Sequence, residues 1–150
     1  MTDTHITPSQ TQGAALVRRF GMTGGPIFML NLLRFRDMAD YSHAPDLAPV
    51  KAITGAEAYA RYEAAISPLL AETGGAIVFD GLGGDWFIGP EAAHWHRVLI
   101  VRQTDLTSFF SFASRPDAIL AGHHRTAALA DSRLLPMTAQ PPLALAETAP

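Results

Sequence analysis

One apolar stretch near the N-terminus, IFMLNLLRFR at residues 27–36, constrains the fold more than any other part of this sequence. It has the length of a single strand, and in a strand successive side chains point to opposite faces. Both faces are apolar, so each of them needs cover from another part of the protein. A single amide, Asn31, lies at the centre of the stretch. The apolar side chains are Phe28, Leu30 and Leu32 on one face and Ile27, Met29 and Leu33 on the other.

The segments around this strand predict an ordered series of helices and strands. Thr7 and Pro8 are typical of a helix start, and Thr54 with Glu57 forms a capping box for a second helix. Three phenylalanines near residue 110 are expected to pack in the core from a short helix capped by Thr104 or Asp105. The predicted helices span residues 8–20, 55–73, 106–112 and 116–130, and the predicted strands span residues 26–35, 76–83, 94–103 and 132–137.

This order is that of the ferredoxin-like fold, so the sequence predicts an α+β, βαββαβ sandwich with an extra N-terminal helix. In that fold the helices cover one face of a four-stranded sheet and leave the other face bare. Because the first strand is apolar on both faces, a second copy of the chain is the expected cover, which predicts a homodimer.

Length and connections predict one domain. A single domain is expected over residues 1–150, with the core at about 26–137 and a flexible tail at 138–150. Residues 37–53 form a long connection with no clear period, and connections of that kind are often functional lids or arms.

Charge and composition exclude several classes of function. The formal net charge is −3 and Lys51 is the single lysine, which argues against nucleic-acid binding. The sequence has no cysteine, so it offers no thiolate nucleophile, disulfide or zinc–thiolate site. No stretch reaches the run of about 18 apolar residues that a membrane span needs, and the first residues lack a signal-peptide pattern. We therefore expect a cytoplasmic protein without a membrane or nucleic-acid partner.

Three stretches resemble the DUF1330 proteins, a family of unknown function. They are PIFMLNLLRFR at residues 26–36, YARYEAAISPLLAETGG at 59–75 and HRTAALADSRLLPM at 124–137. The resemblance covers roughly residues 7–137. It implies a dimeric α/β barrel of the ferredoxin-like kind, in agreement with the order of elements, and it supplies no catalytic residues to carry over.

The central amide of the first strand is the first candidate for a ligand site. Asn31 shares a face with the apolar side chains of Met29 and Leu33. A buried amide needs hydrogen-bond partners, so it either bonds to neighbouring backbone or faces a cavity that holds water or a ligand. We take Asn31 as the marker of a pocket wall.

Arginines supply the other candidate ligand-binding groups. Arg34 lies on the opposite face near the strand end, where it is either a carboxylate or phosphate receptor or an exposed terminus. Arg97 could bind a ligand or form a cross-strand ion pair with Asp80 or Asp85. Arg125 ends the last helix, where a cationic side chain suits the carbonyl end of the helix dipole, and Arg133 at the start of the last strand is a possible pocket or dimer contact. The predicted ligand-binding residues are Asn31, Arg34, Arg97, Arg125 and Arg133.

Histidines are the candidates for acid–base chemistry or metal binding. His94 and His96 should point to one side of a strand, about 6–7 Å apart. They could hold a metal if Asp80, His123 or His124 converged on them, but no second ligand motif is present, and surface histidines are the favoured interpretation. We predict no metal site. The candidate general acids or bases are His96 and His124.

The sequence leaves three interpretations of function open. The first is an enzyme that needs no cofactor and acts on a small organic carbonyl or aromatic compound in an apolar pocket lined by Asn31. The second is a non-catalytic homodimer in which residues 37–53 close over an unknown small-molecule ligand. The third is a purely structural homodimer. No cofactor is expected in any of them.

Overall fold

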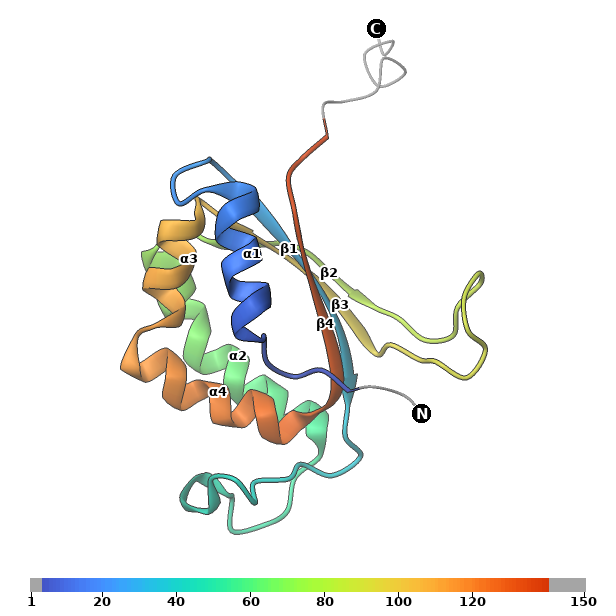
Figure 1. Ribbon diagram of the computed structural model, residues 1–150. Coiled ribbons are helices and arrows are strands. Elements are labelled where there is room, and N and C mark those ends of the chain that lie inside the picture. The colour runs from blue at the N-terminus through green and yellow to red at the C-terminus, as the bar shows by residue number, and fades with distance from the viewer. Residues whose placement is uncertain (1–3, 141–150) are drawn as a thin grey trace, which may run out of the picture.

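The computed structural model describes residues 4–140, which form one sheet with helices on one side (Figure 1). The sheet has four strands in the order β2-β3-β1-β4, and every neighbouring pair is antiparallel. This is the strand order of the ferredoxin-like fold that the sequence predicts. The elements in chain order are α1 Gln10–Phe20, β1 Ile27–Phe35, the short 3-10 helix η1 Pro45–Leu47, α2 Gly55–Glu72, β2 Ala76–Leu82, β3 Arg97–Gln103, α3 Leu106–Ala113, α4 Pro116–Ala128 and β4 Leu129–Met137.

The helix starts follow from capping side chains. The capping box of Thr54 and Glu57 at the start of α2 is confirmed. The predicted start of α1 is wrong, because Ser9 and not Thr7 accepts the hydrogen bond from Gln12 and forms the cap. Asp105 caps α3 by accepting from the backbone N–H of Ser108.

Two predicted strand boundaries are also wrong. β3 begins at Arg97 and not at residue 94, because residues 83–96 leave the sheet as a long projecting hairpin. β4 begins at Leu129 and not at residue 132, because α4 ends directly in the strand and Leu129 already pairs with Phe35 of β1. The pairing therefore starts three residues earlier than the turn-like sequence Asp131-Ser132 indicates.

The face of the sheet that the helices cover holds the core. On β1, Ile27, Met29 and Leu33 are at most 2% exposed. Phe112 belongs to one buried cluster with the end of α2, and Phe109 and Phe110 pack against another, which confirms the core role predicted for these rings. α1 adds Leu16 and Phe20 to the second of these clusters.

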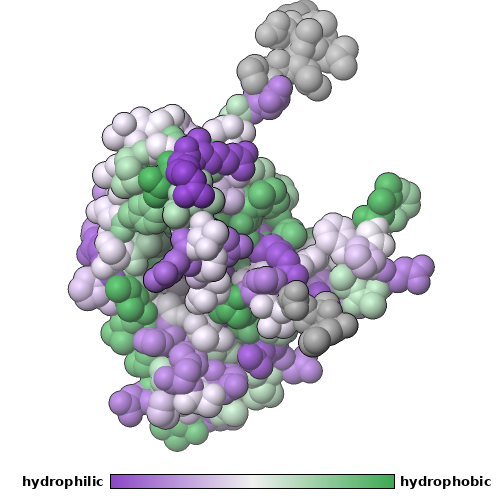
Figure 2. All heavy atoms as spheres, in the orientation of Figure 1, coloured by the Kyte–Doolittle hydropathy of each residue, from purple (hydrophilic) through white to green (hydrophobic). Residues whose placement is uncertain are grey.

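The opposite face of the sheet has no helix over it in the part of the chain that the structure describes (Figure 1). We call it the uncovered face. Its outer strands expose large apolar side chains, with Val78, Phe79 and Leu135 each just over half exposed, at 51%, 53% and 54%. The hairpin of residues 83–96 projects beyond the sheet and carries the exposed side chains Trp86, Phe87 and Ile88 near its tip, where Figure 2 shows hydrophobic atoms gathered.

The long connection between β1 and α2 folds back against the core. Backbone bonds join Ala39 to Ile53 and Asp40 to Ala127 of α4, and Leu47 packs on the buried cluster around Leu33. Of the tail predicted to be flexible, residues 141–150 lie outside the described residues. None of the helices within residues 4–140 has the length and apolar character that crossing a bilayer requires.

The start of α2 depends on a glycine. Gly55 donates its N–H to the carbonyl of Arg36, and a Cβ at this position would lie 2.2 Å from that oxygen and 2.7 Å from the oxygen of Ala128. We expect Gly55→Ala to lower the free energy of unfolding by about 3 kcal/mol, because backbone cannot move aside for it. Gly122 in α4 has open space around it, so Gly122→Ala should raise stability by up to about 1 kcal/mol. Urea unfolding of both variants tests the contrast, and equal effects would contradict it.

Candidate functional site

Most of the predicted site residues lie at one end of the sheet, where β1 ends and β3 and β4 begin. We call this region the polar end. It divides between the two faces of the sheet, and Asn31 lies outside it, near the middle of β1. The polar end contains Arg34, His96, Arg97, His124, Arg125 and Arg133.

Arg97 is the centre of an ion-pair network on the covered face. Its guanidinium donates to both carboxylate oxygens of Glu63 on α2, at 2.5 and 2.8 Å, and to both oxygens of Asp80 on β2, at 2.9 and 2.7 Å. The predicted pair with Asp80 is confirmed, and Glu63 is a second partner. The guanidinium also lies 5.8 Å from the ring centre of Tyr59. The hydrogen bonds of the Arg97 guanidinium thus go to carboxylates of the protein, and they join α2 to β2 and β3.

A row of rings runs beside this network. His96 stacks on Phe35 at 5.9 Å, and the ring of Phe35 lies 5.4 Å from Tyr59, which in turn lies 5.3 Å from Tyr62. Burial raises the pKa of both tyrosines above the ordinary value of 10, although the charge of Arg125 acts in the opposite direction on both. Both phenols are therefore protonated at neutral pH and do not act as bases.

The two histidines proposed for acid–base chemistry are both bonded through Nδ1. Nδ1 of His96 accepts the backbone N–H of Phe35 at 2.9 Å, which leaves Nε2 as its free ring nitrogen. Nδ1 of His124 lies 2.7 Å from the hydroxyl of Tyr41. Burial lowers the pKa of His124, and the positive charge of Arg61 lowers it further. His124 therefore holds the long connection of residues 37–53 against α4.

Two of the predicted arginines meet a tryptophan at the uncovered face. The guanidinium carbons of Arg34 and Arg133 lie 5.0 and 5.2 Å from the ring centre of Trp95, which is 8% exposed. Arg34 is oriented by the bond from its Nε to the carbonyl of His94 at 2.9 Å. Arg133 bonds to the carboxylate of Asp131 and to the carbonyl of Ser132. Cation–π contacts of this kind fix the base of the projecting hairpin to the sheet.

Arg125 and the start of β4 hold the N-terminal segment. Arg125 donates through Nη1 to the carbonyl of Ile6 at 2.7 Å, and Ser132 donates its hydroxyl to the carbonyl of His5 at 2.5 Å. Asp131 is 1% exposed and accepts the backbone N–H of His5 at 2.8 Å. Burial alone would raise the pKa of Asp131, but hydrogen bonds from the N–H of His5, from Arg133 and from the N–H of Ser132 hold it below its ordinary value.

Asn31 is buried on the covered face, as its place in the strand predicts. It is 9% exposed, and its Nδ2 donates to the carbonyl of Met29 in the same strand at 3.0 Å. Of the two alternatives, the bond to neighbouring backbone is the one observed. Asn31 does not line either of the two hollows described next.

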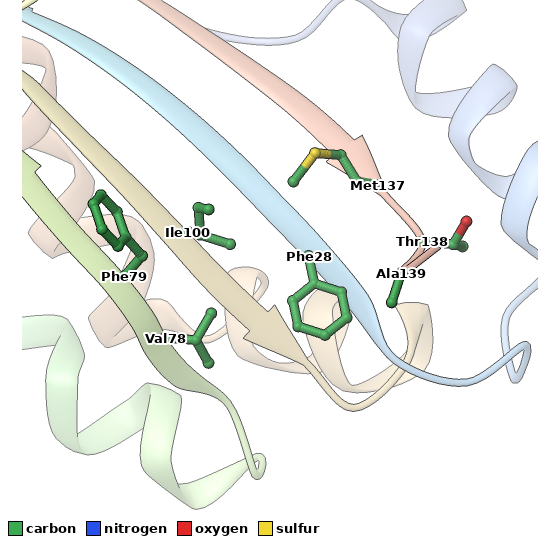
Figure 3. A pocket seen from close by; sticks show the side chains of 7 residues that line it. All are labelled: Phe28, Val78, Phe79, Ile100, Met137, Thr138 and Ala139. Atoms are coloured by element: carbon green, nitrogen blue, oxygen red, sulfur yellow. The ribbon is translucent and has the colours of Figure 1, made fainter. Parts of the chain in front are cut away.

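Two hollows mark the uncovered face. The larger has a volume of about 290 Å³, and all four strands contribute to its wall, with the side chains pointing away from the helices (Figure 3). Its lining is almost wholly apolar. The smaller, of about 130 Å³, lies between Trp95 and the base of the projecting hairpin. The residues of the larger hollow are Phe28, Val78, Phe79, Ile100, Met137, Thr138 and Ala139.

In the described part of the chain, side chains of the kinds that bind metals do not come together at one place. His94 forms an ion pair with Asp85 at 2.5 Å, and His96 turns toward Phe35. Within residues 4–140 no group of three or more histidine, aspartate or glutamate side chains is close enough to hold a metal ion.

The known proteins that resemble this chain show its family. The RPA0582 protein of Rhodopseudomonas palustris, a protein of unknown function, is 34% identical, and its crystal structure matches 93% of this chain and 100% of that chain with a TM-score of 0.82. This chain belongs to the RPA0582 family. The structure of methylated RPA0582 matches 93% of this chain and 97% of that chain at a TM-score of 0.81 and 34% identity.

The other comparisons give no further information about the family of this chain. A dimeric protein of unknown function with a ferredoxin-like fold from Bacteroides fragilis is 17% identical over 75% of this chain and 95% of that chain, at a TM-score of 0.45. No family model and no curated protein matches the chain. The RPA0582 family therefore establishes ancestry and fold, and leaves the function to be argued from the site.

Sequence reasoning missed three features of the polar end. Glu63 could have been found, because it lies one helical turn after Tyr59 and so faces the sheet with it. Trp95 carries no periodic signal, because it lies outside a regular strand. The N-terminal contacts join residues more than 100 positions apart, which no local pattern encodes.

The pair between Arg97 and Asp80 should make stability depend on pH. Hydrogen bonds from Arg97 lower the pKa of Asp80 below 3.8, so its stabilisation is present above the unfolded-state pKa and is lost as pH falls through the folded pKa. We expect Asp80→Asn to lower the free energy of unfolding at pH 7 by about 0.5–1 kcal/mol, since the pair is partly exposed. At an acid pH below the folded-state pKa, where the carboxyl is protonated, the difference should shrink.

Urea unfolding at both pH values measures this effect. Asp46→Asn is a matched control, because Asp46 is exposed and makes none of these contacts. An equal loss for Asp80→Asn at both pH values would contradict the electrostatic explanation.

Proposed function

We propose that two copies of this chain pack through their uncovered faces, and that the homodimer binds a small, mainly apolar organic compound in the larger hollow, at the interface. The observation that carries the proposal is the apolar uncovered face. It combines half-exposed side chains from the outer strands with a hollow to which every strand contributes. Large contiguous apolar surfaces of soluble proteins usually mark interaction sites.

The area of the face fits a dimer if the projecting hairpin takes part. Four strands about 4.8 Å apart and about seven residues long give a flat area of roughly 450 Å². A stable interface buries about 800 Å² on each partner. The projecting hairpin extends away from the helices, on the side of the uncovered face (Figure 1), and its exposed Trp86, Phe87 and Ile88 offer the remaining apolar area.

Binding is better supported than catalysis. The hollow of about 290 Å³ is near the lower end of the size of ligand sites, and a partner sheet would close its open side. The polar end holds the candidate acids and bases, but Nδ1 of His96 and of His124 is already bonded within the protein. Arg97 is neutralised by two carboxylates. A non-catalytic ligand-binding homodimer that needs no cofactor is therefore the function we propose.

We also propose membership of the DUF1330 group and a dimeric α/β barrel as the assembled form. The βαββαβ order, the extra N-terminal helix and the bare sheet face support both. The cytoplasmic location expected from the sequence stays a prediction.

A charge on the uncovered face should break the dimer. Leu135 on β4 and Leu120 on α4 have nearly the same exposure in the single chain, 54% and 55%, but lie on opposite sides of the sheet. In sedimentation at micromolar concentration, we expect the wild type and Leu120→Asp to be dimers and Leu135→Asp to be a monomer. A monomeric wild type, or equal disruption by both variants, would refute the interface.

Ligand binding should depend on the larger hollow. In a thermal-shift screen with phenols, quinones, lactones and small carboxylates, a compound at 100 times its dissociation constant should stabilise the folded state by about 2.7 kcal/mol. Val78→Lys places a charge in the hollow and should abolish the shift, whereas Ile77→Lys, at a neighbouring exposed position that does not line the hollow, should keep it. A shift that survives Val78→Lys would place the ligand elsewhere.

A further inference from the structure

The N-terminal segment before α1 is held by side chains and not by a strand partner. Residues 4–8 have no helix or strand, and all but Ile6 are exposed. Three side chains of α4 and β4 nevertheless bind the main chain of two consecutive residues, His5 and Ile6. Side chains that bind the main chain of another segment can recognise a peptide by its amide groups.

The three contacts are complementary in chemistry. The carboxylate of Asp131 accepts the N–H of His5 at 2.8 Å, and the hydroxyl of Ser132 donates to the carbonyl of the same residue at 2.5 Å. The guanidinium of Arg125 donates to the carbonyl of Ile6 at 2.7 Å and reaches Ser132 at 3.4 Å through its second nitrogen. One acceptor and two donors therefore match one N–H and two carbonyls of a short segment that bends at Ile6 and Thr7.

An apolar contact accompanies these bonds. The side chain of Ile6 packs against the buried cluster that includes Leu33, Tyr59 and Leu129. The side chain of His5 is exposed. The segment thus contributes its backbone and one branched aliphatic side chain.

We propose that Arg125, Asp131 and Ser132 form a binding site for an amide-bearing compound with a branched aliphatic group, and that residues 5 and 6 occupy it in the unliganded protein. A peptide or an N-acylated amino-acid amide has this chemistry. The site lies away from the larger hollow of the uncovered face and does not depend on the proposed dimer.

Release of the segment would leave strong hydrogen-bonding groups without their partners. Asp131 is 1% exposed and would keep only its bonds to Ser132 and Arg133, and Ser132 would lose its acceptor. A buried group without a hydrogen-bond partner costs free energy, so binding of a compound that restores the bonds is favourable. The segment is exposed and irregular, and such segments open at the lowest free energy in a protein.

The experiment supplies the segment in trans. A variant that lacks residues 1–6 is titrated with the probe acetyl-Thr-His-Ile-Thr-amide, which copies residues 4–7, by calorimetry and thermal shift. We expect the probe to bind and stabilise the truncated variant. Its affinity for the full chain should be at least about tenfold lower, because the tethered segment competes with it.

Matched controls separate the site from non-specific binding. The probe with alanine in place of histidine should bind the truncated variant equally well, and the probe with serine in place of isoleucine should not bind. Ser132→Ala in the truncated variant should weaken binding, because the donor to the first carbonyl is lost. A folded truncated variant that fails to bind the probe, or that binds the isoleucine and serine probes alike, overturns the proposal.

A full-length variant keeps the test decisive if the truncated one does not fold. Ile6→Ser retains the chain length and removes only the apolar contact of the segment. It should bind the probe more tightly than the wild type does, with circular dichroism as the check on folding. Equal affinity of the two full-length proteins for the probe overturns the proposal.

Discussion

Burial of the apolar strand β1 is the constraint on which this structure depends. One of its faces is fully covered by helices, with Met29 and Leu33 at most 2% exposed. The side chains of its other face lie beside those of β3 and β4, the two strands that pair with β1. No helix of the described chain lies over this face. The proposed dimer follows from this asymmetry, because removing a contiguous apolar surface from water is favourable.

The polar end shows why a sequence can identify candidate ligand-binding side chains without identifying a ligand-binding site. The sequence predicts Arg97, Arg125 and Arg133 as ligand-binding residues. In the structure each of them bonds to a partner in the same chain: Arg97 to two carboxylates, Arg125 to a backbone carbonyl, and Arg133 to Asp131. Arg97 and Arg133 therefore join elements within the folded chain, and the apolar uncovered face is the better candidate for binding the apolar compound of the proposed function.

Sequence reasoning recovered what is encoded locally. The alternation of β1, the capping box of Thr54 and the order of elements each depend on residues within a few positions of one another, and each is observed. The length of the hairpin before Arg97 and the anchoring of His5 by Asp131 depend on tertiary contacts instead. The placement of Asn31 was predictable and its partner was not, because both a backbone carbonyl and a cavity satisfy an amide.

The measurement that tests the central claim most directly is the reactivity of a single thiol on each side of the sheet. The sequence has no cysteine, so an introduced thiol reports on one position. Phe79 on the uncovered face and Ile119 on α4 are similarly exposed in the single chain, at 53% and 58%. If two uncovered faces pack together, Phe79→Cys reacts with a maleimide much more slowly than Ile119→Cys at micromolar protein. Equal rates at the two positions would contradict the account.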